Sequence, residues 1–162
     1  MTTLSVNINK FALVRNARNQ NTPDIVELSR RCLEYGAHGI TVHPRPDERH
    51  IRYDDCAPLK TLISETFQDC ELNIEGYPTP RFLTLIDEIR PHQVTLVPDP
   101  PEAITSSFGW DLITHQAFLE EVTRQLKTWG CRVSLFLDPD YHTLTPLTSI
   151  QPDRIELYTY FY

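Results

Sequence analysis

The sequence predicts an α/β fold built from repeated strand–helix units. Short runs rich in β-branched residues alternate with longer stretches whose apolar residues recur with the period of a helix. A strand followed by a helix and then by another strand indicates parallel strands joined by helical crossovers. Several of the strand runs are apolar with little alternation, which is typical of a sheet covered on both faces.

The predicted strands are short and are spread along the whole chain. They are Leu4–Ile8, Gly39–Val42, Glu71–Ile74, Gln93–Val97, Arg132–Leu137 and Arg154–Tyr158. Their number and spacing fit either an open doubly wound sheet or part of a (β/α)8 barrel. The pattern alone does not separate these two architectures.

The clearest predicted helix begins at Thr22-Pro23, with threonine as the N-cap and proline at the first helical position. Its apolar stripe runs from Ile25 to Leu33, and Gly36 ends it.

Two more helices have recognisable ends. One begins at Thr79-Pro80 and is terminated by Pro91, and another runs from about Thr114 to Gly130. Weaker helical patterns cover Asp54–Phe67 and His142–Ile150.

Length and charge limit the possible functions. The chain has 162 residues, 40% of them hydrophobic, which suffices for one domain spanning residues 1–162. Its formal net charge of −7 argues against bulk binding to nucleic acid or to an anionic membrane. We find neither an apolar run long enough to span a membrane nor a signal peptide, so we expect a soluble, cytoplasmic protein.

The four cysteines are far apart and have no ligand spacing with histidines. We therefore expect free thiols in a reducing compartment, with no disulfide framework and no metal site. Glycine-rich phosphate-binding motifs and the nucleophile elbow of hydrolases are also absent from the sequence.

Polar side chains follow the carboxyl ends of the predicted strands, where parallel α/β folds carry their chemistry. They are Asn7, Asn9 and Lys10 after the first strand, His43 and Arg45 after the second, Glu75 after the third, Thr105 beyond the fourth, Asp138 after the fifth and Glu156 within the sixth. Agreement among so many strand ends predicts a site at this edge of the sheet.

The segment from His43 to Arg52 concentrates three arginines and two histidines in ten residues of an acidic chain. Such a segment suits a small anion such as a phosphate ester, because guanidinium groups pair with phosphate oxygens. On charge alone, a solvated loop in which Asp47 and Glu48 neutralise the arginines is the more common case. Arg15 and Arg18 leave the same choice open between anion binding and an ordinary helix surface.

Glu75 ends an apolar strand, where an uncompensated carboxylate is costly. A carboxylate in such a place usually has a partner or a raised pKa, which is the environment of a general base. His43 by itself would more often be a hydrogen-bonded structural histidine than a catalyst. The remaining histidines, His38, His92, His115 and His142, show no partner pattern and are interpreted as structural.

Ordered blocks from Ser5 to about Thr159 resemble the pyridoxine 5′-phosphate synthase family, the PdxJ-type enzymes of vitamin B6 biosynthesis. The blocks are Val6–Lys10, Arg15–Arg18, Gly36–His43 with Arg45 and His50-Ile51, Asn73–Glu75, Thr95–Pro98 with Ile104-Thr105, Val133–Phe136 with Asp138, and Ile155-Glu156. Blocks in this order are far more specific than any single motif.

The resemblance implies a (β/α)8 barrel of the TIM type, of which about six βα units are present as one incomplete domain. It implies a condensation of 3-amino-2-oxopropyl phosphate with 1-deoxy-D-xylulose 5-phosphate. The products are pyridoxine 5′-phosphate, inorganic phosphate and water, and no cofactor is required. The partners it implies are the two phosphate esters and further copies of the chain, since the family forms homo-octamers.

The resemblance also implies roles for individual residues. Proton acceptors would be His43 and Glu75, with Glu156 as a further active-site carboxylate. The residues expected to bind substrate are Asn7 and Arg18 for the aminoketone phosphate, and Asn9, Lys10, Arg45, His50 and Thr105 for the deoxyxylulose phosphate.

Three departures from the family pattern accompany this resemblance. Asn9-Lys10 stands where the common pattern is Asp-His, and the loop after the fourth strand is rich in proline. The printed sequence stops at Tyr162, whereas family members continue for two more βα units. Those units supply a histidine proton donor and a glycine-histidine phosphate site.

We therefore expect the 162-residue chain alone to aggregate, or to be held in an oligomer, with negligible synthase activity. Two alternatives remain open. The chain could be a non-catalytic relative that binds phosphate esters, or a module that only joins full-length subunits.

Overall fold

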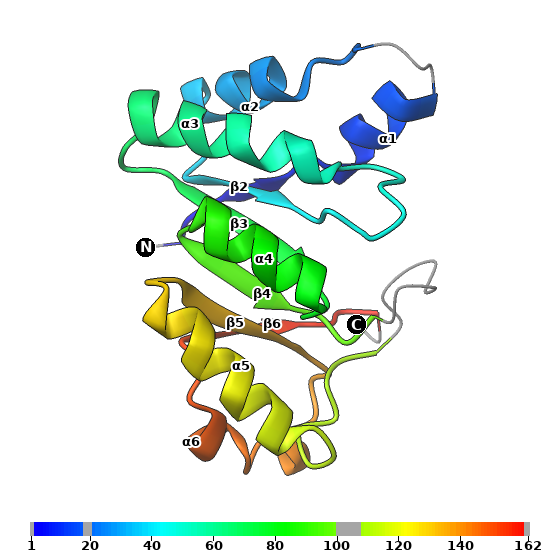
Figure 1. Ribbon diagram of the computed structural model, residues 1–162, viewed down its shortest axis with the longest axis vertical. Coiled ribbons are helices and arrows are strands. Elements are labelled where there is room, and N and C mark those ends of the chain that lie inside the picture. Colours follow the sequence, from blue (N-terminus) through cyan, green and yellow to red (C-terminus); the bar gives the residue numbers. More distant parts are fainter. Residues whose placement is uncertain (1, 18–20, 100–107, 161–162) are drawn as a thin grey trace. The chain divides into compact units, whose positions relative to one another are not determined.

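The computed structural model describes residues 2–17, 21–99 and 108–160. Contacts divide the chain into two compact units, Met1–Glu75 and Gly76–Tyr162. In the described residues, six strands alternate with helices along the chain (Figure 1). The predicted α/β class is thereby confirmed, with βα units that follow one another as in the first part of a (β/α)8 barrel. None of the described helices is long and apolar enough to cross a membrane.

The first unit contains three parallel strands. Its elements are β1 (Ser5–Asn7), α1 (Asn9–Ala17), α2 (Ile25–Glu34), β2 (Gly39–Val42), the 3-10 turn η1 (Tyr53–Asp55), α3 (Cys56–Thr66) and β3 (Glu71–Gly76). Strand β2 pairs with β1 on one side and with β3 on the other. Helices α2 and α3 contact each other and lie side by side (Figure 1).

Alternation along β2 and β3 separates an apolar face from a polar one. Ile40, Val42, Leu72 and Ile74 are fully buried. The residues between them point to the opposite face of the sheet, because successive side chains of a strand alternate. There the Thr41 hydroxyl accepts a hydrogen bond from Asn73 Nδ2 at 3.3 Å. The site residues of β2 and β3 continue this polar row.

Helix α1 is an element that the sequence patterns above did not predict. Asn9 and Lys10, which we placed at the end of the first strand, form its first turn. Asn7 Oδ1 accepts a hydrogen bond from the Asn9 backbone N–H at 3.0 Å. An amide in this position satisfies one of the donors that the first turn of a helix leaves without an intrahelical acceptor.

The start of α2 also differs from the prediction. The N-cap is Asp24 rather than Thr22, and its carboxylate accepts from the backbone N–H groups of Val26 and Glu27. Aspartate is as strong an N-cap as serine or asparagine and somewhat stronger than threonine. The predicted end near Gly36 is confirmed, because Gly36 has a φ of 96° just after the helix.

The second unit repeats the same plan with three more parallel strands. Its elements are α4 (Pro80–Ile89), β4 (Gln93–Leu96), α5 (Gln116–Thr128), β5 (Arg132–Leu137), the 3-10 turn η2 (Tyr141–Thr143), α6 (Leu147–Ile150) and β6 (Arg154–Leu157). Strand β5 pairs with β4 and with β6. The predicted cap of α4 is confirmed, since Thr79 Oγ1 accepts from the Phe82 N–H at 3.2 Å.

Strand β6 exposes apolar side chains. Ile155 is 45% exposed and Leu157 is 46% exposed. Both residues are unlike their β5 neighbours Leu135 and Leu137, which are buried. Exposed apolar residues on a strand with a free edge favour association with another chain.

We expect the 162-residue chain to self-associate, because association would cover Ile155 and Leu157 of β6. The double substitution Ile155→Thr with Leu157→Thr keeps residues with high strand propensity and removes most of the apolar surface. Sedimentation velocity should show a larger monomer fraction for this variant. The same change made at two exposed residues of α1, Leu13→Thr with Val14→Thr, serves as the control. Equal sedimentation of all three proteins would contradict the role assigned to β6.

Candidate active site

His43 and Glu75 meet because β2 and β3 pair in register. Thr41 lies opposite Asn73, and Val42 lies opposite Ile74. The next residues along the two strands are His43 and Glu75, and both belong to the polar face. His43 Nδ1 lies 3.8 Å from Glu75 Oε2, slightly longer than a direct hydrogen bond. Both residues are buried.

His50 enters the same region from the loop that follows β2. The loop closes on itself through a bridge between Pro44 and Ile51. The rings of His43 and His50 lie edge to face, with centroids 5.9 Å apart. His50 Nδ1 accepts a hydrogen bond from the Ile51 backbone N–H at 2.9 Å. The proton of a neutral His50 ring must therefore be on Nε2, which is left as a donor.

Burial and neighbouring cations keep both imidazoles neutral. The pKa of His43 falls from 6.5 to about 3, chiefly because the ring is buried and then because Arg45 lies nearby. The pKa of His50 falls from 6.5 to about 4 for the same two reasons. Arg45 is itself buried. At neutral pH the site therefore presents two uncharged imidazoles beside a fixed positive charge.

Helix α1 brings Asn9 and Lys10 to the same strand ends. The Asn9 side-chain oxygen accepts a hydrogen bond from the His43 backbone N–H at 2.8 Å. Lys10 lies close enough to His50 to lower the pKa of its imidazole. This bond uses one of the two lone pairs of Asn9 Oδ1 and none of the amide hydrogens of Asn9.

The first unit thus gathers most of the predicted site residues within one compact body. They are Asn7, Asn9, Lys10, His43, Arg45, His50 and Glu75. Glu156 belongs to β6 in the second unit, where a hydrogen bond with Thr95 counteracts part of the rise in its pKa caused by burial. Arg18 and Thr105 lie outside the described residues.

Two of the arginines considered above, Arg15 and Arg45, are buried in the structure. The loop is partly self-neutralising, since Arg49 pairs with Asp47 at 2.6 Å, yet Arg45 is buried beside the histidines. Arg15 is not an ordinary helix-surface residue, because it is 3% exposed and is paired with Asp55 at 2.6 Å. The partner lies 40 positions away in sequence, and no local pattern links the two residues.

Comparison with known proteins identifies the family. The model of the family described as "Pyridoxal phosphate biosynthesis protein PdxJ" matches residues 4–162. The chain is 52% identical to a pyridoxine 5′-phosphate synthase of Cytophaga hutchinsonii and 49% identical to one of Porphyromonas gingivalis, in each case over 98% of this chain and 65% of the relative. The corresponding enzyme of Allorhizobium ampelinum is 50% identical over 96% of this chain and 63% of its own length.

These matches show that the chain belongs to the PdxJ family, as the resemblance implied. It spans 63–65% of the length of these relatives. Among solved structures, a mandelate oxidase variant with benzaldehyde has a TM-score of 0.53 at 10% identity, covering 82% of this chain and 44% of that chain. This likeness concerns the fold alone.

The lowered histidine pKa values predict how stability depends on pH. Between about pH 4 and 6.5, the unfolded chain binds protons that the folded imidazoles of His43 and His50 do not. The free energy of unfolding should therefore be highest above the ordinary histidine pKa and fall as the pH decreases from about 7 to about 5. Urea denaturation at several pH values would measure this slope.

The slope should become shallower in His43→Gln and stay unchanged in His142→Gln, which alters an exposed histidine. A free energy of unfolding that is constant over this pH range in the unsubstituted chain would contradict the neutral state assigned to the two rings.

Proposed function

We propose that this chain forms the substrate-binding and proton-accepting part of a pyridoxine 5′-phosphate synthase. The observation that carries the proposal is the buried pair of His43 and Glu75 at neighbouring strand ends, beside the buried cation of Arg45. The names of the relatives support the same activity. The reaction would condense 3-amino-2-oxopropyl phosphate with 1-deoxy-D-xylulose 5-phosphate.

The pair suits this chemistry because the condensation needs repeated proton transfers. Joining an amine to a ketone, eliminating phosphate and closing an aromatic ring each require a base close to the reacting carbon or nitrogen. A neutral His43 retains a lone pair that can accept a proton, and a carboxylate at Glu75 is a second acceptor. Their 3.8 Å separation allows both to act on one bound molecule.

The cations around the pair suit the two phosphate esters. Arg45 offers a planar guanidinium for one ester, and His50 Nε2–H offers a neutral donor beside it. Lys10 adds charge on the same side. By family resemblance these groups, with Asn9 and Thr105, would hold the deoxyxylulose phosphate. Asn7 and Arg18 would hold the aminoketone phosphate.

We further propose that Glu156 acts as an additional carboxylate, because burial raises its pKa and favours the protonated form. In its protonated form the carboxyl group can donate a proton, and in its ionised form it can accept one. The family resemblance places a histidine donor and a further phosphate site in the part of the relatives beyond the matched region, so activity is expected of the full-length protein. Buried free thiols at Cys56 and Cys131 are consistent with a cytoplasmic setting.

We expect Glu75→Gln to lower turnover by roughly 10²–10⁴-fold in the full-length protein, as is typical of losing a general base. The amide has the shape of the carboxylate but cannot accept a proton, so binding of either ester should change little. Steady-state assays of pyridoxine 5′-phosphate formation would measure the loss. Glu65→Gln makes the same change at an exposed position of α3 and is the control. Normal turnover in Glu75→Gln would make Glu75 structural.

Arg18→Ala and Arg45→Ala should weaken different substrates, since the two residues follow different strands. Calorimetric titration with each phosphate ester separately should show Arg18→Ala affecting the aminoketone phosphate and Arg45→Ala the deoxyxylulose phosphate. Arg31→Ala, which removes an exposed cation from α2, is the control. Equal weakening of both esters by both variants would indicate that the arginines support the fold instead.

A further inference from the structure

Helix α1 holds the segment from His43 to His50 at both of its ends. At its first residue, the Asn9 side chain accepts the backbone N–H of His43. Near its last turn, the side chains of Arg15 and Asn16 both donate to the backbone oxygen of His50, seven residues after His43. The roles that the family resemblance implies concern substrate binding and proton transfer, and none of them is assigned to Arg15 or Asn16.

The contacts that Asn16 makes with the loop are all with main-chain oxygens. Its Nδ2 lies 3.1 Å from the carbonyl oxygens of both Glu48 and Arg49 and 2.7 Å from that of His50. Its Oδ1 accepts a hydrogen bond from Arg15 Nε at 3.1 Å. The guanidinium can only donate, so the orientation of the amide is fixed by chemistry, with its hydrogens toward the loop.

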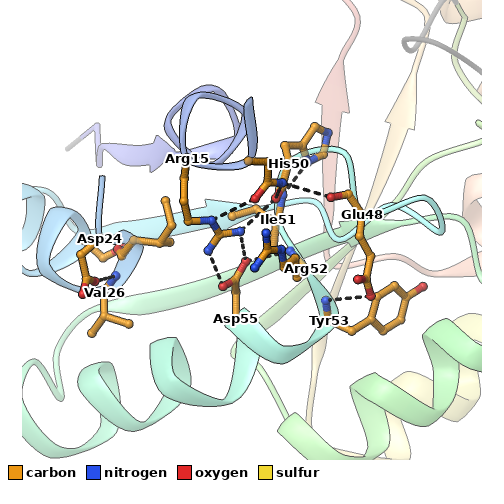
Figure 2. A network of polar contacts seen from close by, with 12 residues as sticks. Arg15, Asp24, Val26, Glu48, His50, Ile51, Arg52, Tyr53 and Asp55 are labelled. Carbon is orange, nitrogen blue, oxygen red and sulfur yellow. Dashed lines mark hydrogen bonds and ion pairs between the residues drawn. The ribbon is translucent and has the colours of Figure 1, made fainter. Parts of the chain in front are cut away.

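Arg15 connects this loop to the start of α3. Its two terminal nitrogens lie 2.6 and 2.9 Å from the two carboxylate oxygens of Asp55, and one of them also donates to the His50 carbonyl at 3.2 Å. Asp55 in turn accepts the Arg52 backbone N–H at 2.7 Å. Figure 2 shows the Arg15 side chain reaching both Asp55 and His50. A buried, forked pair of this kind fixes direction as well as distance.

We propose that Arg15, Asn16 and Asp55 form a positioning clamp that holds the main chain of residues 48–50 and so presents the His50 ring to the phosphate-ester substrate. The clamp does not contact His43 or Glu75 through any of these bonds, so it acts on the reaction only through the loop. The inference rests on the proposed function, because it takes His50 as a substrate-binding group.

The loop requires such restraint because its backbone is strained at Glu48. Glu48 has a φ of 53°, a left-handed conformation that is unfavourable for a residue with a side chain. The His50 ring is held separately from the His50 carbonyl, because its Nδ1 accepts the Ile51 backbone N–H. Fixing the His50 carbonyl and the His50 ring together leaves Nε2–H aimed in one direction.

Arg15→Lys tests the clamp in the full-length protein, because lysine keeps the charge and loses the fork. We expect the KM for the deoxyxylulose phosphate to rise by roughly 10-fold or more, since small displacements of a positioning group are costly. The KM for the aminoketone phosphate should change much less. Asn16→Ser, which removes the amide without altering charge, should produce the same split if Arg15→Lys does not fold.

Controls separate positioning from general loss of stability. Arg31→Lys makes the same exchange at an exposed ion pair on α2. Thr79→Ala removes the N-cap of α4 and destabilises a helix of the second unit. Both controls should leave the ratio of the two KM values unchanged. An unchanged ratio in Arg15→Lys and Asn16→Ser as well would overturn the clamp.

A second measurement does not depend on the proposed reaction. The His50 ring, followed by NMR, should titrate near the lowered pKa of about 4 in the unsubstituted protein. In Arg15→Lys the released loop admits water and the pKa should rise toward 6.5, while Arg45, Arg49, Asp47 and Lys10 around the ring are unchanged. If the unsubstituted protein makes no pyridoxine 5′-phosphate, the proposed function fails, and this titration still supports or overturns the clamp. An identical His50 titration in both proteins would overturn it.

Discussion

The in-register parallel pairing of β2 with β3 is the constraint on which the candidate site depends. A shift of one residue in this register would send the polar row of one strand to the apolar face, because side chains alternate along a strand. The observed register places Thr41 beside Asn73 and leaves His43 next to Glu75. Buried Ile40, Val42, Leu72 and Ile74 hold this register, since slipping would expose them. The relative placement of His43 and Glu75 is therefore a consequence of hydrophobic burial on the opposite face.

Helix α1 transmits this constraint to the loop after β2. The helix begins directly after β1, which pairs with β2, so its position relative to His43 is set by the sheet. Side chains at its two ends then fix two points of the loop that carries Arg45 and His50. A loop of this length has many accessible conformations, and the free energy of ordering it has to come from such contacts. The ion pair of Arg15 with Asp55 is buried and hydrogen-bonded, which makes it directional.

Sequence patterns predicted the strands well, but they predicted only some of the helix N-termini correctly. Gly39–Val42 and Arg132–Leu137 have the predicted bounds, and α4 has the predicted threonine cap. Helix α1 was missed because its apolar residues, such as Leu13 and Val14, remain exposed and form no stripe that would indicate a core-facing side. The strand ends correctly indicated the neighbourhood of His43 and Glu75. The burial of Arg15 depends on Asp55, and such a pairing across 40 residues is decided by tertiary structure alone.

Under the proposed function, the electrostatics of the site would couple ligand binding to proton transfer. Burial, followed by the charges of Arg45, His50 and Arg49, lowers the pKa of His43 to about 3, so its imidazole is weakly basic. A phosphate ester bound beside these cations would bring negative charge that offsets their effect, and the same imidazole would become a stronger base. Burial opposes this change, since a desolvated ring resists charge whatever its neighbours. Under the proposed function, His43 would gain basicity only to the extent that a bound ester offsets these charges. Because burial is the larger cause of the neutral His43 and the cations the smaller one, a bound ester would reverse only the part of the pKa lowering that comes from Arg45 and Arg49.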